Sequence, residues 1–213
     1  SGTVLVKDIN ASGSSDPGDF AIVGTTLFFA ATDGTNGREL WKTDGTAAGT
    51  VLVKNIYPEP MSGPNSSSPQ NLINFNGTLF FEATDGTNGR ELWKSNGTAA
   101  GTVLVKDISP GAPSSFIAQA SNNLTIVGTS LLFAADDGTH GRELWKSDGT
   151  TAGTVLVKDI NPGGPVSHAI LIDDALPIDH VAIGSAYYFA AEDGAHGVEL
   201  WKSDGTASGT VLI

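Results

Sequence analysis

Short runs of β-branched and apolar residues recur along the chain, and each run is bounded by Gly, Asn, Asp or Ser. Runs of this kind between turn-forming residues predict β-strands. The first run, residues 3–9 (TVLVKDI), returns three times with at most one change and once in a shortened form. Its copies are residues 50–56, 102–108, 154–160 and 210–213.

A longer stretch, residues 29–50 (FAATDGTNGRELWKTDGTAAGT), is repeated three times without insertion or deletion. Its copies are residues 81–102, 133–154 and 189–210. The tryptophans of the four copies are 52, 52 and 56 positions apart. Self-similarity at a fixed period of about fifty residues is typical of repeat architectures. The chain is therefore interpreted as one domain of four similar modules.

Within a module, turn signals separate four short strands. In the first module, residues 20–23, 27–31, 38–42 and 50–56 are strand-like, and Asp-Gly sequences interrupt them. In the second module the first two strands are joined by Asn76-Gly77, which is a strong hairpin signal because both residues accept positive φ. Helical periodicity is absent from the sequence. Each module is therefore predicted to be an antiparallel meander.

Several strands are apolar on both faces, for example residues 27–31 (LFFAA) and 186–191 (AYYFAA). A sheet of such strands must be covered on both sides. Radial stacking provides this cover, so we expect an all-β fold: a β-propeller of four four-stranded antiparallel blades, or a four-blade segment of a larger propeller or array. A linear solenoid is the alternative, but it needs polar end modules, and neither end module is depleted of apolar residues in that way.

The expected blades are approximately residues 10–56, 57–108, 109–160 and 161–213, and residues 1–9 form a candidate closing strand. Residues 3–9 and 210–213 are copies of the same fourth strand, so both compete for one slot beside residues 198–202. Residues 3–9 are the longer copy and can form more strand-to-strand hydrogen bonds than residues 210–213. We therefore expect residues 3–9 to occupy the slot and residues 210–213 to fray.

The composition excludes some function classes. The formal net charge of -12 argues against a nucleic-acid partner, because such proteins gather Lys and Arg on one face. The chain has no cysteine, so redox and thiolate-metal chemistry are excluded. No apolar run is long enough to predict a membrane span. The sequence contains no nucleophile elbow, phosphate-binding loop or pair of catalytic carboxylates, and an enzyme is not expected.

The string at residues 39–46 (ELWKTDGT) returns at residues 143–150 and 199–206, and at residues 91–98 it departs once, with Asn96 in place of Asp. It resembles the bacterial ELWxxDGT repeat, a family also called hyalin-like. The resemblance implies a propeller fold, an extracellular or cell-surface location and no enzymatic activity. We therefore expect a non-catalytic structural or adhesion module whose partners are other surface proteins, glycans or further copies of itself. The alternative is a lectin-like propeller that binds a carbohydrate, with calcium as an assisting ion.

Four aspartates open the Asp-Gly loops: Asp33, Asp85, Asp137 and Asp193. Each loop gathers several oxygens in a short span, which is what a hard cation such as calcium requires. The spacing does not match the twelve-residue calcium loop. The competing interpretation is that each aspartate only makes its turn by accepting backbone N–H groups. No other cofactor is expected.

The repeated core is predicted from residues that recur in every copy: Trp41, Trp93, Trp145, Trp201, Glu39, Glu91, Glu143 and Glu199. A large ring at the same place in every blade favours packing between sheets over a platform for a sugar ring. Each glutamate is expected to pair with a lysine of a neighbouring blade.

All variation in module length lies in the connection between the last strand of one module and the first strand of the next. In repeat proteins such insertions often collect on the binding face. These connections carry Tyr57, Phe116 and His168, which are the candidate ligand-binding residues.

Overall fold

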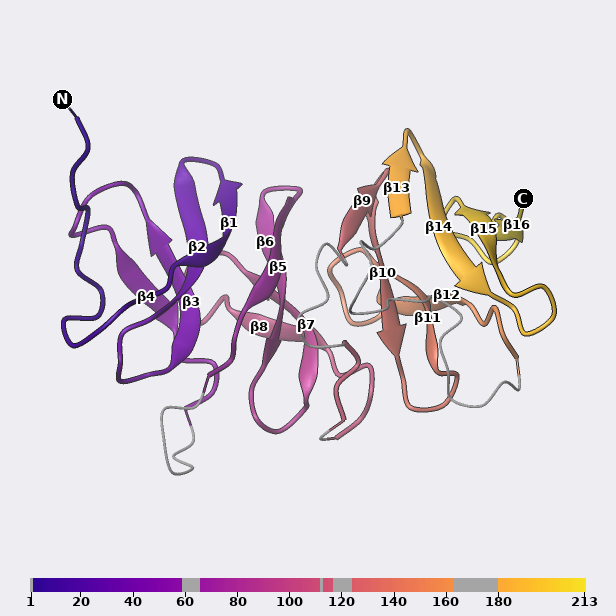
Figure 1. Cartoon of the computed structure of the whole chain (residues 1–213), viewed down its shortest axis with the longest axis horizontal. Helices are drawn as coiled ribbons and strands as arrows, with labels where there is room; N and C mark the ends of the chain where they lie inside the picture. Colours follow the sequence, from indigo (N-terminus) through magenta and orange to yellow (C-terminus); the bar gives the residue numbers. More distant parts are fainter. Residues whose placement is uncertain (1, 59–65, 112, 117–123, 163–179) are drawn as a thin grey trace. The chain divides into compact units, whose positions relative to one another are not determined.

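The computed structural model describes residues 2–58, 66–111, 113–116, 124–162 and 180–213 (Figure 1). His168 therefore lies outside the described residues. The chain divides into two compact units, Ser1–Leu104 and Val105–Ile213. Each unit is described by itself.

The described residues are all-β and form four sheets of four antiparallel strands, as the sequence predicts. In the first unit, one sheet contains β1 (Gly18–Val23), β2 (Thr26–Thr32), β3 (Arg38–Thr43) and β4 (Val51–Lys54). The next contains β5 (Gln70–Phe75), β6 (Thr78–Thr84), β7 (Arg90–Ser95) and β8 (Val103–Lys106), whose last two residues begin the second unit.

The second unit repeats this plan. One sheet contains β9 (Thr125–Val127), β10 (Ser130–Asp136), β11 (Arg142–Ser147) and β12 (Val155–Lys158). The other contains β13 (His180–Ile183), β14 (Ala186–Glu192), β15 (Val198–Ser203) and β16 (Val211–Leu212). In every sheet the strands follow one another in chain order (Figure 1). The described residues contain no helix that is long and apolar enough to cross a membrane.

The second and third strands of each sheet are held in one register. Phe29 is directly opposite Trp41, and the same Phe–Trp pair recurs in the other three sheets. A shift by one residue would turn every side chain to the opposite face. The fixed spacing from Phe to Trp in the sequence is therefore the spacing that keeps both rings on one face.

The turn after the third strand explains the invariant DGT sequence. Asp44 Oδ1 accepts hydrogen bonds from the N–H and the hydroxyl of Thr46, and Thr46 Oγ1 accepts one from the N–H of Gly49. In the second sheet Asn96 Oδ1 accepts the same two bonds from Thr98. The turn therefore needs a side-chain oxygen but no charge, which is why the single departure from the motif leaves the turn unchanged.

Within each unit the two sheets pack face to face through equivalent residues. In the first unit, Phe28 and Leu40 of one sheet lie in a cluster with Phe81 and Trp93 of the next. In the second unit, Leu132 and Leu144 meet Phe189 and Trp201 in the same way. The first strands also meet, because Asn74 of β5 donates to the carbonyl of Ile22 in β1, at 2.9 Å. These contacts explain why strands that are apolar on both faces are stable here.

The expectation for the chain ends is wrong. Residues 2–8 form no strand, whereas β16 pairs with β15 through Trp201↔Leu212 and Lys202↔Val211. The cause is the short connection between β15 and β16, since closing a short loop costs little entropy. The greater length of residues 3–9 does not compensate for the much longer loop that their pairing would close.

Candidate functional site

Polar groups gather at one end of each sheet, where the turn between the second and third strands lies. We call this the acidic loop end. It consists of residues 33–37 and 85–89 in the first unit and of residues 137–141 and 193–197 in the second. Thr32 N–H donates to Ser15 O, and Thr84 N–H to Ser67 O. In the first three sheets, where Asp136 N–H also donates to Ser115 O, the connection therefore lies against the strand that leads into the loop.

Each aspartate of the acidic loop end is the acceptor that closes its own turn. Asp33 Oδ1 accepts the N–H groups of Thr35 and Asn36, both at 2.8 Å, and Asp33 Oδ2 accepts Asn36 Nδ2 at 2.7 Å. Burial raises the pKa of Asp33, but the hydrogen bonds from Asn36 and Thr35 outweigh it and hold this pKa below its ordinary value. The carboxylate is therefore charged at neutral pH and held in place by its turn.

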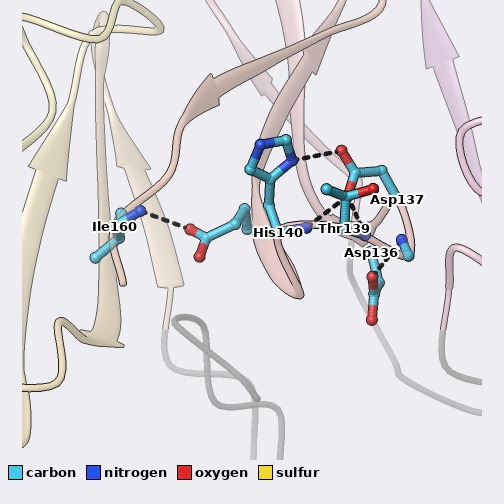
Figure 2. Close-up of polar contacts among 7 residues, drawn as sticks. Asp136, Asp137, Thr139, His140 and Ile160 are labelled. Carbon is cyan, nitrogen blue, oxygen red and sulfur yellow. Dashed lines mark hydrogen bonds and ion pairs between the residues drawn. The ribbon is translucent and has the colours of Figure 1, made fainter. Parts of the chain in front are cut away.

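The second unit replaces asparagine by histidine at the same position. His140 Nδ1 lies 2.8 Å from Asp137 Oδ2, and His196 Nδ1 lies 2.8 Å from Asp193 Oδ2 (Figure 2 shows His140). The hydrogen bond that His140 donates to Asp137 raises the pKa of His140. The hydrogen bond from His196 lowers the pKa of Asp193 to about 2. These turns therefore carry an imidazole whose charge depends on pH.

Calcium stays a prediction at these loops. In the part of the chain that the structure describes, no group of three or more His, Cys, Asp or Glu side chains could hold a metal ion. Both carboxylate oxygens of Asp33 and of Asp85 already accept hydrogen bonds within their turns. The geometry therefore favours the interpretation in which the aspartates make the turns.

The repeated glutamate is buried in the first three sheets and exposed in the fourth, at Glu199. Glu39 and Glu143 bind the backbone, which corrects the expected pairing with lysine. Glu39 accepts hydrogen bonds from the N–H of Ile56 at 2.9 Å and from the N–H and hydroxyl of Ser67. It thus ties the third strand to the connection that leads to the next sheet. The lysines bind elsewhere because the carboxylate is enclosed and already occupied by these donors.

Glu143 is the equivalent residue in the third sheet, and it accepts the N–H of Ile160 at 2.9 Å (Figure 2). Burial, with a smaller contribution from the nearby charge of Asp159, raises the pKa of Glu143 to about 7. The sequence analysis missed Asp159. The signal was present, because the residue before Ile in the repeated VLVKDI run is acidic or an amide in every copy. Glu143, Asp159 and His140 therefore form a group whose charges depend on one another.

All four tryptophans are buried. Trp93 and Trp201 lie between the two sheets of their units, whereas Trp41 packs on Phe29 of its own sheet and on Ile9. A lysine of the preceding sheet lies over the ring in three cases: Lys54 on Trp93, Lys106 on Trp145 and Lys158 on Trp201, at 5.8, 5.6 and 5.4 Å from the ring centroid. This position leaves no face of these rings open to a sugar. The tryptophans are therefore part of the packing.

The candidate ligand-binding residues of the connections are placed differently from one another. Tyr57 is half-buried, and its ring lies so close over Gly86 that a Cβ there would overlap it. Phe116 is buried, with its ring centroid 5.4 Å from that of Phe133. Phe116 is thus a core residue, whereas Tyr57 lies at the acidic loop end with part of its surface exposed.

No protein-family model matches the chain, and no curated protein matches it. Solved structures do resemble it. A structure of puromycin hydrolase has a TM-score of 0.54 and 13% identity, and the match covers 89% of this chain and 27% of that one. A structure from an analysis of two prolyl endopeptidases has a TM-score of 0.50, 12% identity and coverage of 89% and 24%. The GH43B protein of the Bacteroides ovatus xyloglucan locus has a TM-score of 0.44 and 16% identity, and the match covers 97% of this chain and 42% of that one.

These comparisons contradict the expected function. The two structures with the higher TM-scores are a puromycin hydrolase and a prolyl endopeptidase, whereas the sequence analysis predicted a non-catalytic adhesion module or a lectin-like protein. Sequence identities of 13% and 12% show only that the chain shares a fold with these two proteins. The chain spans about a quarter of the length of the two hydrolases with the higher TM-scores.

Proposed function

We propose that this chain is the β-propeller part of a hydrolase that acts on peptides, with the acidic loop end facing the substrate. The observation that carries the proposal is the similarity over 89% of the chain to puromycin hydrolase and to a prolyl endopeptidase. The repeated face-to-face contact of the sheets within each unit supports the propeller arrangement.

The charge of the acidic loop end points to the kind of peptide. Asp33 and Asp85 in the first unit, and Asp137 and Asp193 in the second, all have a lowered pKa and are ionised at neutral pH. The whole chain has a net charge of -12. Because negative charge raises the local concentration of oppositely charged ligands, the proposed substrate is a peptide with a positive net charge.

The ELWxxDGT-like motif supports an extracellular or cell-surface site of action for this hydrolase. It is the sole support for that location.

Binding and cleavage of proline-containing peptides by the 213-residue chain test the proposal. A cationic peptide should bind saturably, with an affinity that falls as salt is added, whereas an acidic peptide of matched length should not bind. The variant Asp137→Asn with Asp193→Asn should bind more weakly. Asparagine keeps the side-chain oxygen of the turn, as Asn96 does in the other turn, and removes the charge.

The control ligand is a neutral oligosaccharide. Equal binding of both peptides, or saturable binding of the oligosaccharide alone, contradicts the proposal. Mass spectrometry of the peptide after incubation shows whether the chain also cleaves it.

A further inference from the structure

We propose that Asn76 is a site of spontaneous chemical modification, at which the side-chain amide is lost and part of the product carries isoaspartate in the backbone. Asparagine followed by glycine is prone to this reaction, because glycine has no side chain to hinder the approach of its backbone nitrogen. The sequence contains four such pairs, at residues 36–37, 76–77, 88–89 and 96–97. The structure singles out the second pair as the one that reacts.

The reaction needs water as its one co-reactant. The backbone nitrogen of Gly77 loses its proton and bonds to Cγ of Asn76, and the bond from Cγ to Nδ2 breaks as ammonia leaves. Water then opens the cyclic imide. If the bond from the imide nitrogen to Cγ is cleaved, the product is aspartate. If the bond to the backbone carbonyl carbon is cleaved, the product is isoaspartate, and the chain runs through the former side chain.

The side chain of Asn76 is free to react. Asn76 and Gly77 form the two-residue turn between β5 and β6, and both are exposed. They have φ angles of 51° and 77°, as a hairpin turn of this length requires. Within the ranges that the structure describes, no hydrogen bond restrains the side chain of Asn76. The amide can therefore rotate toward the nitrogen of Gly77.

The two asparagines of the acidic loop end are restrained. Asn36 Nδ2 donates to Asp33 Oδ2 at 2.7 Å, and Asn36 Oδ1 accepts Asn55 Nδ2 at 3.0 Å. In the next sheet Asn88 Nδ2 donates to Asp85 Oδ2 at 2.7 Å. Each of these amides must leave a charged acceptor before it can rotate. Both pairs should therefore react slowly in the folded chain.

Asn96 is exposed, but its amide and the nitrogen that would attack it are both held. Asn96 Oδ1 accepts the N–H of Thr98 at 3.0 Å and the hydroxyl of Thr98 at 2.7 Å. Gly97 is buried, and its N–H donates to Ser95 Oγ at 3.0 Å. The reaction at Asn96 would have to break these bonds and expose a buried nitrogen. It is therefore protected as well.

A hydrogen bond from Asn74 restrains the nitrogen that reacts with Asn76. The N–H of Gly77 donates to Asn74 Oδ1 at 3.0 Å, and Asn74 Nδ2 donates to the carbonyl of Ile22 at 2.9 Å. The nitrogen must leave Asn74 before it can turn toward Cγ. Because Asn74 is exposed, this bond can open locally without unfolding of the sheet. Asn74 thus slows the reaction and also links the turn to β1.

Isoaspartate at position 76 weakens the contact between the two sheets of the first unit. It adds a methylene to the backbone of a turn whose length sets the pair Phe75↔Thr78. In the longer turn Asn74 cannot hold the N–H of Gly77 and the carbonyl of Ile22 at the same time. Aspartate keeps the length of the turn and accepts positive φ. The damage therefore comes from the isoaspartate product.

Timed incubation of the folded 213-residue chain at mildly alkaline pH, followed by digestion and mass spectrometry with fragmentation, tests the proposal. Replacement of NH₂ by OH should appear first at Asn76 and stay low at Asn36, Asn88 and Asn96. In denaturant the four pairs should react at comparable rates, because only the fold distinguishes them. If Asn76 reacts no faster than the others in the folded chain, or keeps its lead in denaturant, the proposal is overturned.

Two substitutions test the restraint by Asn74. Asn74→Ala removes the acceptor of the Gly77 N–H and should raise the rate at Asn76 several-fold. Asn74→Asp removes the donor to Ile22 but keeps an acceptor oxygen, and it should not raise the rate. Equal rates in the two variants would overturn the restraint.

Asn76→Gly is the matched control for the effect on stability, because glycine accepts positive φ and has no amide to lose. After incubation the unchanged chain should melt at a lower temperature than before, in proportion to its isoaspartate content. The Asn76→Gly variant should melt as it did before incubation. An equal decrease in both chains would overturn the effect given to isoaspartate at this turn.

Discussion

Lys158 and Trp201 join consecutive sheets of the second unit. The Nζ atom of Lys158 lies 5.4 Å from the centroid of the Trp201 ring and donates a hydrogen bond of 2.8 Å to the carbonyl of Thr210. Lys106 repeats both interactions with Trp145 and Thr154. One lysine thus binds both the ring and the backbone of the following sheet, and this explains why the lysine recurs with the tryptophan.

Replacing Lys158 by Met should lower the free energy of unfolding by about 1–2 kcal/mol, through loss of the cation–π contact and of the charged hydrogen bond. Methionine keeps most of the apolar stem. Chemical denaturation measures the change. Lys202→Met is the control, because Lys202 is exposed, and it should change stability by less than about 0.5 kcal/mol. Equal effects of the two substitutions would contradict the role given to Lys158.

The raised pKa of Glu143 predicts a loss of stability as the pH rises. Its folded-state pKa is about 7, above the ordinary value of 4.5. Between these values the folded chain keeps a proton that the unfolded chain has released, so the free energy of unfolding falls with increasing pH. Below pH 4.5 Glu143 is protonated in both the folded and the unfolded chain, and above about pH 7 it is ionised in both, so its contribution does not change with pH there.

Glu143→Gln removes this titration while its amide oxygen can still accept the N–H of Ile160. The variant should therefore gain stability relative to the unchanged chain between pH 5 and pH 8, as measured by denaturation at both values. A stability difference that is the same at the two pH values would show that Glu143 does not titrate in this window.

His196 predicts a separate dependence on pH. The hydrogen bond that His196 donates to Asp193 raises the pKa of His196 above its ordinary value of 6.5. The stability that this pair contributes is therefore present below pH 6.5 and is lost as the pH rises through the folded-state pKa. Nuclear magnetic resonance of the imidazole protons should show the raised pKa directly.

The repeat itself offers the matched variant, His196→Asn. In the first module Asn36 occupies the equivalent position and donates to Asp33 Oδ2 at 2.7 Å. Asparagine at position 196 should therefore keep the hydrogen bond to Asp193 while removing the group that titrates. The unchanged chain should exceed the variant in stability by more at pH 5 than at pH 9. A constant difference would mean that the Asp193–His196 pair has no pH-dependent contribution.

Calcium should not stabilise the chain through Asp33, because both oxygens of this carboxylate are acceptors in the turn. Melting with calcium and with a chelator should therefore coincide. A ligand at a hundred times its dissociation constant adds about 2.7 kcal/mol per site. A shift of that order, lost in Asp33→Asn, would establish a metal site in the loop.

The repeated residues made much of the fold predictable. The Phe29–Trp41 spacing sets the strand register, and the Asn76-Gly77 pair sets a hairpin whose residues both have positive φ. The partners of Glu39 were not predictable, because Ser67 belongs to a connection whose path the repeat does not determine. The pairing of β16 was misjudged because the greater length of residues 3–9 was weighted above the entropy of loop closure.

Amide hydrogen exchange along the chain tests the central claim, that one four-stranded antiparallel plan is repeated four times. At a concentration where the chain is monomeric, the slowest amides should lie in β2–β3, β6–β7, β10–β11 and β14–β15, and residues 2–8 should exchange rapidly. Slow exchange in residues 2–8 equal to that in β4, or protection that does not recur with the repeat, would contradict it.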